Sequence, residues 1–314
     1  MRVLITGATR GIGLAIVEAL ADDDNVIYLG CRDTSCGQNM SYMIAGRKGL
    51  GPEAIIPVKL DVTDAESIAA AAASVAASGH KLDAIVNNAG VLLERDGTDL
   101  DAIVEPTLRV NVDGVVAVTT TFLGLIRDGG QVINVSSGAG TRATSALDAT
   151  TFAELESAST PAALRASITR LSHDAASKPH RTSETPIYNI SKCAVNYYTR
   201  LLARQVPRLR VNACSPGFCR TEIAGECTYA EREPKDASLG ASVVLKLLRT
   251  QLGRGSGGFF KESSKPGTPI KLAQSVAEPW FVRDGGETAH EKKAAAAVAA
   301  SAAASTFRSV VPCS

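Results

Sequence analysis

Short apolar runs alternate with helical patterns through the first two-thirds of this 314-residue chain. Strands joined by crossover helices pair in parallel and are covered by helices on both faces. The expected strands are residues 2–6, 26–30, 54–59, 84–87, 131–135 and 208–213, and the expected helices are residues 13–21, 65–77, 100–123 and 191–205. The sequence therefore predicts an α/β fold with a doubly wound, Rossmann-like parallel sheet, which binds ligands beyond the carboxyl ends of its strands.

Two segments depart from this alternation. Residues 141–187 are too long for an ordinary connection, and local helical patterns at 151–157 and 161–172 predict a helical insertion over about residues 144–184. After about residue 255 the chain becomes rich in Gly, Ser and Lys and then, at 294–304, in Ala. We therefore expect one domain over residues 1–255 and an irregular, Ala-rich extension over 256–314.

Charge and cysteine content exclude several classes of function. The net charge of +1 gives no general attraction to nucleic acid or to an anionic membrane surface. Seven cysteines without a CxxC pair favour reduced thiols over disulfides or a metal site. Cys214 and Cys219 lie near the expected site, where a redox-sensitive thiol or a plain buried cysteine would fit. We expect a cytoplasmic protein with no metal, nucleic-acid or membrane partner.

A glycine-rich turn, Thr6-Gly7-Ala8-Thr9-Arg10-Gly11-Ile12-Gly13, separates the first strand from the first helix. Glycines permit tight backbone geometry and let a pyrophosphate approach the N–H groups at a helix N-terminus. Many glycine turns are only structural, but the strand–turn–helix context favours a dinucleotide site.

Tyr188 and Lys192 lie four residues apart, on one face of an expected helix. A phenol has a pKa near 10, and a neighbouring ammonium lowers it by stabilising the phenolate. The alternative is a solvated helix pair without function. Ser136 and Ser137 end the strand at 131–135, where a hydroxyl could polarise a substrate carbonyl, and the residues alone leave the choice between them open.

These motifs, together with Asp61-Val62, Asn87-Asn88-Ala89-Gly90, Asn111 and Pro216-Gly217 before Thr221, resemble the short-chain dehydrogenase/reductase family over roughly residues 1–250. The resemblance implies a catalytic set of Asn111, Ser137, Tyr188 and Lys192, with Ser137 selected by the S-x-x-G pattern that ends at Gly140. In the family, the asparagine helps to anchor a water that leads from the lysine to solvent. The implied cofactor contacts are Gly7, Arg10, Gly11, Ile12, Gly13, Arg32, Asp61, Val62, Asn88, Tyr188, Lys192, Pro216, Gly217 and Thr221.

The cofactor choice depends on the end of the second strand. An NADH site commonly places an acid there, whereas this chain has Arg32, and Arg10 lies in the glycine turn. Two guanidinium groups suit a 2′-phosphate, although both could be solvated surface arginines, and Asp33 could contact the ribose. The family pattern of basic residues at these places implies NADPH (NADP+).

The segment between Ser137 and Tyr188 resembles the helical insertion of the monomeric carbonyl reductases in this family. That resemblance implies a monomer that reduces a broad range of aldehydes and ketones with NADPH, with Tyr188 as proton donor. Two alternatives stay open. One is an NAD(P)-dependent alcohol dehydrogenase that works mainly in the oxidative direction, and the other is a non-catalytic NADPH-sensing regulator. Against the regulator, the chain keeps all four catalytic positions.

Overall fold

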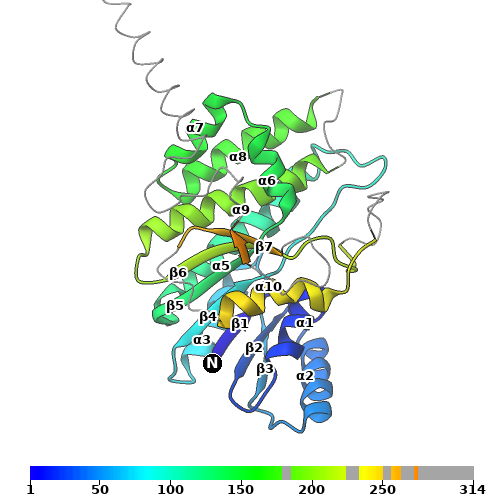
Figure 1. The fold of residues 1–314 in the computed structure, drawn as a ribbon, viewed down its shortest axis with the longest axis vertical. Coiled ribbons are helices and arrows are strands. Elements are labelled where there is room, and N and C mark those ends of the chain that lie inside the picture. Colours follow the sequence, from blue (N-terminus) through cyan, green and yellow to red (C-terminus); the bar gives the residue numbers. More distant parts are fainter. Residues whose placement is uncertain (179–184, 224–232, 250–255, 263–271, 275–314) are drawn as a thin grey trace, which may run out of the picture.

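A computed structural model of the chain describes residues 1–178, 185–223, 233–249, 256–262 and 272–274. Its centre is a sheet in the order β3-β2-β1-β4-β5-β6-β7-β8, in which β8 alone runs antiparallel to its neighbour (Figure 1). The strands are β1 (Arg2–Ile5), β2 (Val26–Cys31), β3 (Ile55–Lys59), β4 (Leu82–Asn87), β5 (Ile126–Val135), β6 (Arg210–Ser215), β7 (Phe259–Glu262) and β8 (Leu272–Gln274). The predicted doubly wound parallel sheet is confirmed, and its strand order changes direction between β1 and β4.

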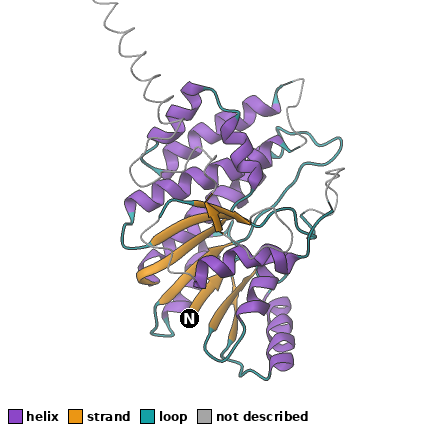
Figure 2. Ribbon diagram, viewed as in Figure 1, coloured by secondary structure: helices purple, strands orange, loops and turns teal. Residues whose placement is uncertain are grey.

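Helices cover both faces of the sheet (Figure 2). One face packs against α1 (Gly11–Leu20), α2 (Thr34–Lys48) and α10 (Ala237–Arg249). The other packs against α3 (Ala65–Ala76), α4 (Val104–Leu108), α5 (Gly114–Phe122) and α9 (Pro186–Gln205). Successive strand residues point to opposite faces, so Val3 and Ile5 join the first core and Leu4 joins the second. Continuous apolar strands are therefore needed to fill both cores.

The helical stretch between β4 and β5 is irregular. It runs from α4 through a π-helical turn, Arg109–Asp113, into α5 and a 3-10 turn, Leu123–Leu125. Residues Val104–Leu125 are long and apolar enough to cross a membrane, with a mean hydropathy of 1.3. They nevertheless pack against β4, β5, α3 and α9, which is the environment of a core helix.

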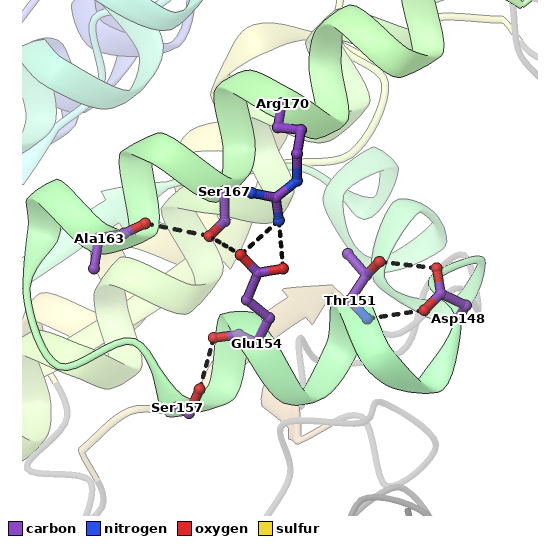
Figure 3. A network of polar contacts seen from close by, with 7 residues as sticks. All are labelled: Asp148, Thr151, Glu154, Ser157, Ala163, Ser167 and Arg170. Carbon is purple, nitrogen blue, oxygen red and sulfur yellow. Dashed lines mark hydrogen bonds and ion pairs between the residues drawn. The ribbon is translucent and has the colours of Figure 1, made fainter.

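The expected insertion contains α7 (Ala149–Ser157) and α8 (Pro161–Ala176), preceded by α6 (Gly138–Ser145). Asp148 begins α7 by accepting a hydrogen bond from the Thr151 N–H at 2.8 Å. Glu154 joins α7 to α8, because its carboxylate accepts from the Ser167 hydroxyl at 2.6 Å and pairs with Arg170 (Figure 3). Helix α8 then packs along α9. The insertion is thus fastened to the helix that carries Tyr188.

The folded domain continues past residue 255, where the sequence pattern led us to end it. Strand β7 pairs with β6, and Phe259 and Phe260 are buried. A four-residue strand at the edge of the parallel array, within Gly- and Ser-rich sequence, has too little alternation to be recognised. The predicted Ala-rich extension at 294–304 lies outside the described residues. Helices α2 and α10 were also missed, α2 because its apolar residues form no stripe along one face.

Phe260→Ala tests whether this segment belongs to the core. Phe260 is 5% exposed and packs in the core beneath α10, so its truncation is expected to lower the free energy of unfolding by about 3 kcal/mol. Urea denaturation measures the change. The control is Tyr42→Ala, at a side chain 84% exposed, which should change stability by less than about 0.5 kcal/mol. If both variants changed the free energy of unfolding equally little, β7 would lie outside the part of the protein that unfolds cooperatively.

Candidate active site

The turn between β1 and α1 has a backbone that requires its glycines. Gly7 and Gly11 have φ values of 62° and 55°, in the left-handed region. A Cβ atom on Gly13 would lie 2.3 Å from Gly7 O. Asn88 Nδ2 donates to Thr6 O and Gly7 O at 2.9 and 3.1 Å, which ties the turn to the end of β4. The turn thus leads tightly into the N-terminus of α1, where free N–H groups can bind an anion.

Arg32 and Asp61 follow the ends of β2 and β3, which are neighbours in the sheet. Burial opposes ionisation of Asp61, yet hydrogen bonds from Thr63 N and Oγ1, at 2.9 and 2.7 Å, favour it. With the positive charges of Arg32 and Arg109 nearby, they hold the pKa of Asp61 below its ordinary value. The negative charge of Asp61 at this edge is therefore favoured by its hydrogen bonds and by the positive charge of Arg32.

Asp33 is occupied as a helix cap. Its Oδ1 accepts from Ser35 Oγ and from Ser35 N, at 2.5 and 2.9 Å, and these bonds lower the pKa of Asp33. The carboxylate thereby begins α2. Because Asp33 is engaged, the exposed side chain of Arg32 is the charged group available to bind a ligand at the end of β2.

The segment after β6 lies across the glycine turn. Gly217, at φ 79°, donates its N–H to Ser215 Oγ at 3.3 Å. The Thr221 methyl carbon is 3.1 Å from the position of a Cβ on Gly11, so there is no room there for a side chain. Pro216, Gly217 and Thr221, all predicted cofactor contacts, therefore lie on the same edge of the sheet as the turn.

Arg10 forms an ion pair with Glu222 on this segment, and the two side chains are 61% and 70% exposed. Exposed ion pairs are worth only about 0–1 kcal/mol. A phosphate group would compete readily for this guanidinium, because charge-assisted bonds to phosphate are stronger. The pairing is thus compatible with the predicted role of Arg10.

Two predicted cofactor residues are engaged in packing. Ile12 Cγ1 lies 3.5 Å from the position of a Cβ on Gly240, where α1 meets α10. Val62 lies against Gly114 at the start of α5, with 2.9 Å to the equivalent position. Both side chains therefore set the spacing of the helices around the site.

Lys192 is a buried ammonium at the end of β5. Its side chain donates from Nζ to Val135 O at 3.0 Å, and its carbonyl accepts from Ser136 Oγ at 3.1 Å. Burial lowers the pKa of Lys192 from 10.5 to about 8, against the opposing influence of Cys214. Nζ lies 5.7 Å from the centre of the Tyr188 ring. Ser136 thus has a structural contact, in keeping with the choice of Ser137 as the reactive hydroxyl.

Tyr188 lies in the first turn of α9, which begins at Pro186 and so earlier than the expected residue 191. Ser137 lies two residues after β5 and begins α6 by accepting from the Ala139 N–H at 3.1 Å. A Cβ on Gly140 would lie 2.6 Å from the backbone of α9, so the two helices are in close contact. The structure thereby brings the helices of Ser137 and Tyr188 together.

Asn111 lies in the π-helical turn and is fully buried. Its Oδ1 accepts from Val91 N and its Nδ2 donates to Val91 O, both at 2.8 Å, and Nδ2 also donates to Ser191 Oγ at 3.0 Å. A Cβ on Gly90 would lie 3.2 Å from Oδ1 and 3.4 Å from Lys192 Nζ. Asn111 and Lys192 therefore flank Gly90, and the water-anchoring role of Asn111 stays a prediction.

Sequence reasoning missed Glu94, which is 4% exposed and accepts a hydrogen bond from the Tyr188 N–H at 2.7 Å. A lone glutamate in a loop carries no motif, and its partner is 94 positions away. Glu94 directly follows the apolar residues 91–93, but the charged residues Arg95 and Asp96 come next, so nothing in the sequence singles it out.

The two cysteines near the site are buried. Burial raises the pKa of Cys214 to about 12, so its thiol is protonated. Cys219 is 3% exposed and its thiol contacts Pro216 O at 3.4 Å. These surroundings favour plain packing over redox chemistry. Among the described residues, no group of three His, Cys, Asp or Glu side chains is placed to hold a metal ion.

A glycine turn and a tyrosine–lysine pair at the same edge of a parallel sheet fit a nucleotide-dependent oxidoreductase. A family model described as short chain dehydrogenase matches residues 1–149. Carbonyl reductase [NADPH] 1 of Sus scrofa is 31% identical over 257 residues, covering 78% of this chain and 85% of its own length. The Homo sapiens protein of that name is 30% identical and covers 82% and 95%.

Salutaridine reductase from Papaver somniferum has a similar fold, with a TM-score of 0.71 and 24% identity over 82% of this chain and 98% of its own. The chain belongs to the short-chain dehydrogenase/reductase family and is carbonyl reductase-like within it.

Lys192→Met is expected to change how stability depends on pH. The pKa of Lys192 is about 8 in the folded protein and higher in the unfolded chain, so the unfolded state binds more protons between about pH 8 and 10.5. The free energy of unfolding of the wild type, relative to that of the variant, should therefore rise as the pH increases through this window and stay low at lower pH. Thermal unfolding without cofactor at pH 7 and pH 10 measures this. The exposed Lys81→Met is the control, and identical pH responses of the two variants would contradict the burial effect.

Proposed function

We propose that this oxidoreductase reduces aldehydes and ketones to alcohols with NADPH, with Tyr188 as proton donor. The observation that carries the proposal is the buried Lys192 ammonium beside the Tyr188 ring, 5.7 Å from its centre. A positive charge in a poorly solvated site favours phenolate over phenol, which brings the proton of Tyr188 closer to transfer at neutral pH. Bound NADPH would supply the hydride.

The other catalytic residues have distinct tasks in this proposal. Ser137, at the open end of β5, would donate a hydrogen bond to the carbonyl oxygen and stabilise its developing negative charge. Lys192 would keep the phenol acidic and contact the nicotinamide ribose, as the resemblance implies. Asn111 holds the wall of the site through Val91. The relatives named carbonyl reductase support the reaction class.

NADPH is the proposed cofactor because the residues around the expected ribose fit it. The glycine turn leads into the N-terminus of α1, whose N–H groups suit a pyrophosphate, and the carboxylate of Asp33 is engaged with Ser35 and with α2. Arg32 and Arg10 are both exposed at this edge, so paired hydrogen bonds to a 2′-phosphate are available from either side chain. The oxidative direction stays an alternative, and the monomeric state and the cytoplasmic location stay predictions.

Tyr188→Phe is expected to lower kcat for carbonyl reduction at least about 100-fold, because the proton donor is lost. Its binding of NADPH, measured by fluorescence titration, should be nearly that of the wild type. Tyr197→Phe removes a hydroxyl from another tyrosine of α9 and is the matched control. NADPH oxidation at 340 nm with a panel of carbonyls is the assay. Normal turnover by Tyr188→Phe would refute the assignment, and no turnover of any carbonyl by the wild type would favour the regulator.

Arg32→Ala is expected to raise the Kd for NADPH by about 10- to 100-fold, because a charge-assisted bond to phosphate is lost. The Kd for NADH, which lacks the 2′-phosphate, should change little. Arg47→Ala, at an arginine paired with Glu18 on the outer side of α2, controls for general charge effects. An equal loss for both coenzymes would show that Arg32 does not read the phosphate.

A further inference from the structure

The backbone of Tyr188 is held on both sides by side chains. Its N–H donates to Glu94 Oε1 at 2.7 Å, and its carbonyl accepts from Ser191 Oγ at 2.7 Å. Ser191 in turn accepts from Asn111 Nδ2 at 3.0 Å, and Asn111 makes two hydrogen bonds to Val91. The backbone from Val91 to Glu94 completes a ring of contacts through Tyr188, Ser191 and Asn111. The backbone of the expected proton donor is therefore part of a hydrogen-bonded ring.

Glu94 supplies what the start of α9 lacks. The first N–H groups of a helix have no partner within it, and Thr185, which precedes α9, makes no side-chain cap. Tyr188, in the first turn, finds its acceptor on a loop that follows β4. The positive end of the helix dipole also favours a carboxylate there. Glu94 is thus a cap delivered from a distant part of the chain.

Stability alone does not account for a carboxylate at this place. Glu94 is 4% exposed, and within the described residues its Oε2 has no hydrogen-bond partner. Burying a carboxylate with a single such bond is costly, and a Ser or Asp at the preceding position caps a helix without that cost. A local cap, however, would not join α9 to the loop beside Gly90, which lies between Asn111 and Lys192.

We propose that Glu94 is a positioning residue that sets where the Tyr188 phenol lies relative to Lys192. This inference rests on the proposed role of Tyr188. When the acceptor is removed, the first turn of α9 loses its attachment to the loop after β4, and the phenol shifts from the hydride-accepting carbonyl. Misplacement of a reacting group by about 1 Å costs up to about 100-fold in rate.

Glu94→Leu and Glu94→Gln provide the test, because both side chains resemble glutamate in size and only the glutamine keeps an oxygen acceptor. We expect Glu94→Leu to lower kcat by about 10- to 100-fold, with the Kd for NADPH little changed. Glu94→Gln should restore most of the lost kcat. All rates are expressed per NADPH-binding site and measured well below each melting temperature. Glu53→Leu, at an exposed glutamate outside the ring, is the control.

A second variant tests the ring itself. Ser191→Ala removes the hydrogen bond to the Tyr188 carbonyl. The changes in activation free energy caused by Ser191→Ala and Glu94→Leu should add up to more than the change in the double variant, because both substitutions loosen the same residue.

If Glu94→Leu does not fold, Glu94→Asp replaces it, because the shorter side chain moves the acceptor away from the Tyr188 N–H.

Wild-type kcat in Glu94→Leu, or equal losses in the leucine and glutamine variants, would overturn the positioning role. A lower melting temperature with unchanged kcat would do so too, because it would show a purely structural cap. Normal turnover by Tyr188→Phe would instead overturn the proposed function. The two failures are therefore distinguishable.

Discussion

The buried ammonium of Lys192 is the constraint on which the site depends. Removing it from water lowers its pKa towards neutrality and costs stability, and a single carbonyl, Val135 O, compensates in part. Only a charge kept in a poorly solvated place can act strongly on a phenol nearby, since water would screen it. Helix α9 is buried along most of its length, including the residues on either side of Lys192, and so keeps the ammonium away from water.

Parallel strands bring the rest of the site to one edge. The glycine turn follows β1, Asn88 follows β4, Ser137 follows β5 and Pro216 follows β6, and these strands are adjacent in the sheet although distant in the sequence. A buried polar chain fixes their spacing. Asn87 Nδ2 donates to Asn134 Oδ1, and Asn134 Nδ2 donates to Thr199 on α9, both at 2.8 Å. Buried polar groups of this kind permit few alternative registers.

Local patterns explain what the sequence could predict. The strands of the parallel sheet are continuous apolar runs because both faces are covered, and Gly13 occupies a place where only glycine fits. Both requirements produce patterns in neighbouring residues that the sequence shows. Contacts between distant parts of the chain produce no such pattern. Helix α2 has no apolar stripe, β7 needs β6 beside it to be a strand, and Glu94 acquires its role only when α9 begins next to its loop. The π-helical turn around Asn111 likewise has no signature in Arg109-Val110-Asn111.

Helix α9 is fixed on its sheet side by Ser136 and Val135 and packed on its outer side by α8 of the insertion. The first turn of the helix lies beyond these two hydrogen bonds. There Ile187 is packed in the core, while the backbone N–H and carbonyl of Tyr188 are held by Glu94 and Ser191. In the proposal, apolar packing places the turn, and the ring through Glu94 and Asn111 orients Tyr188 within it.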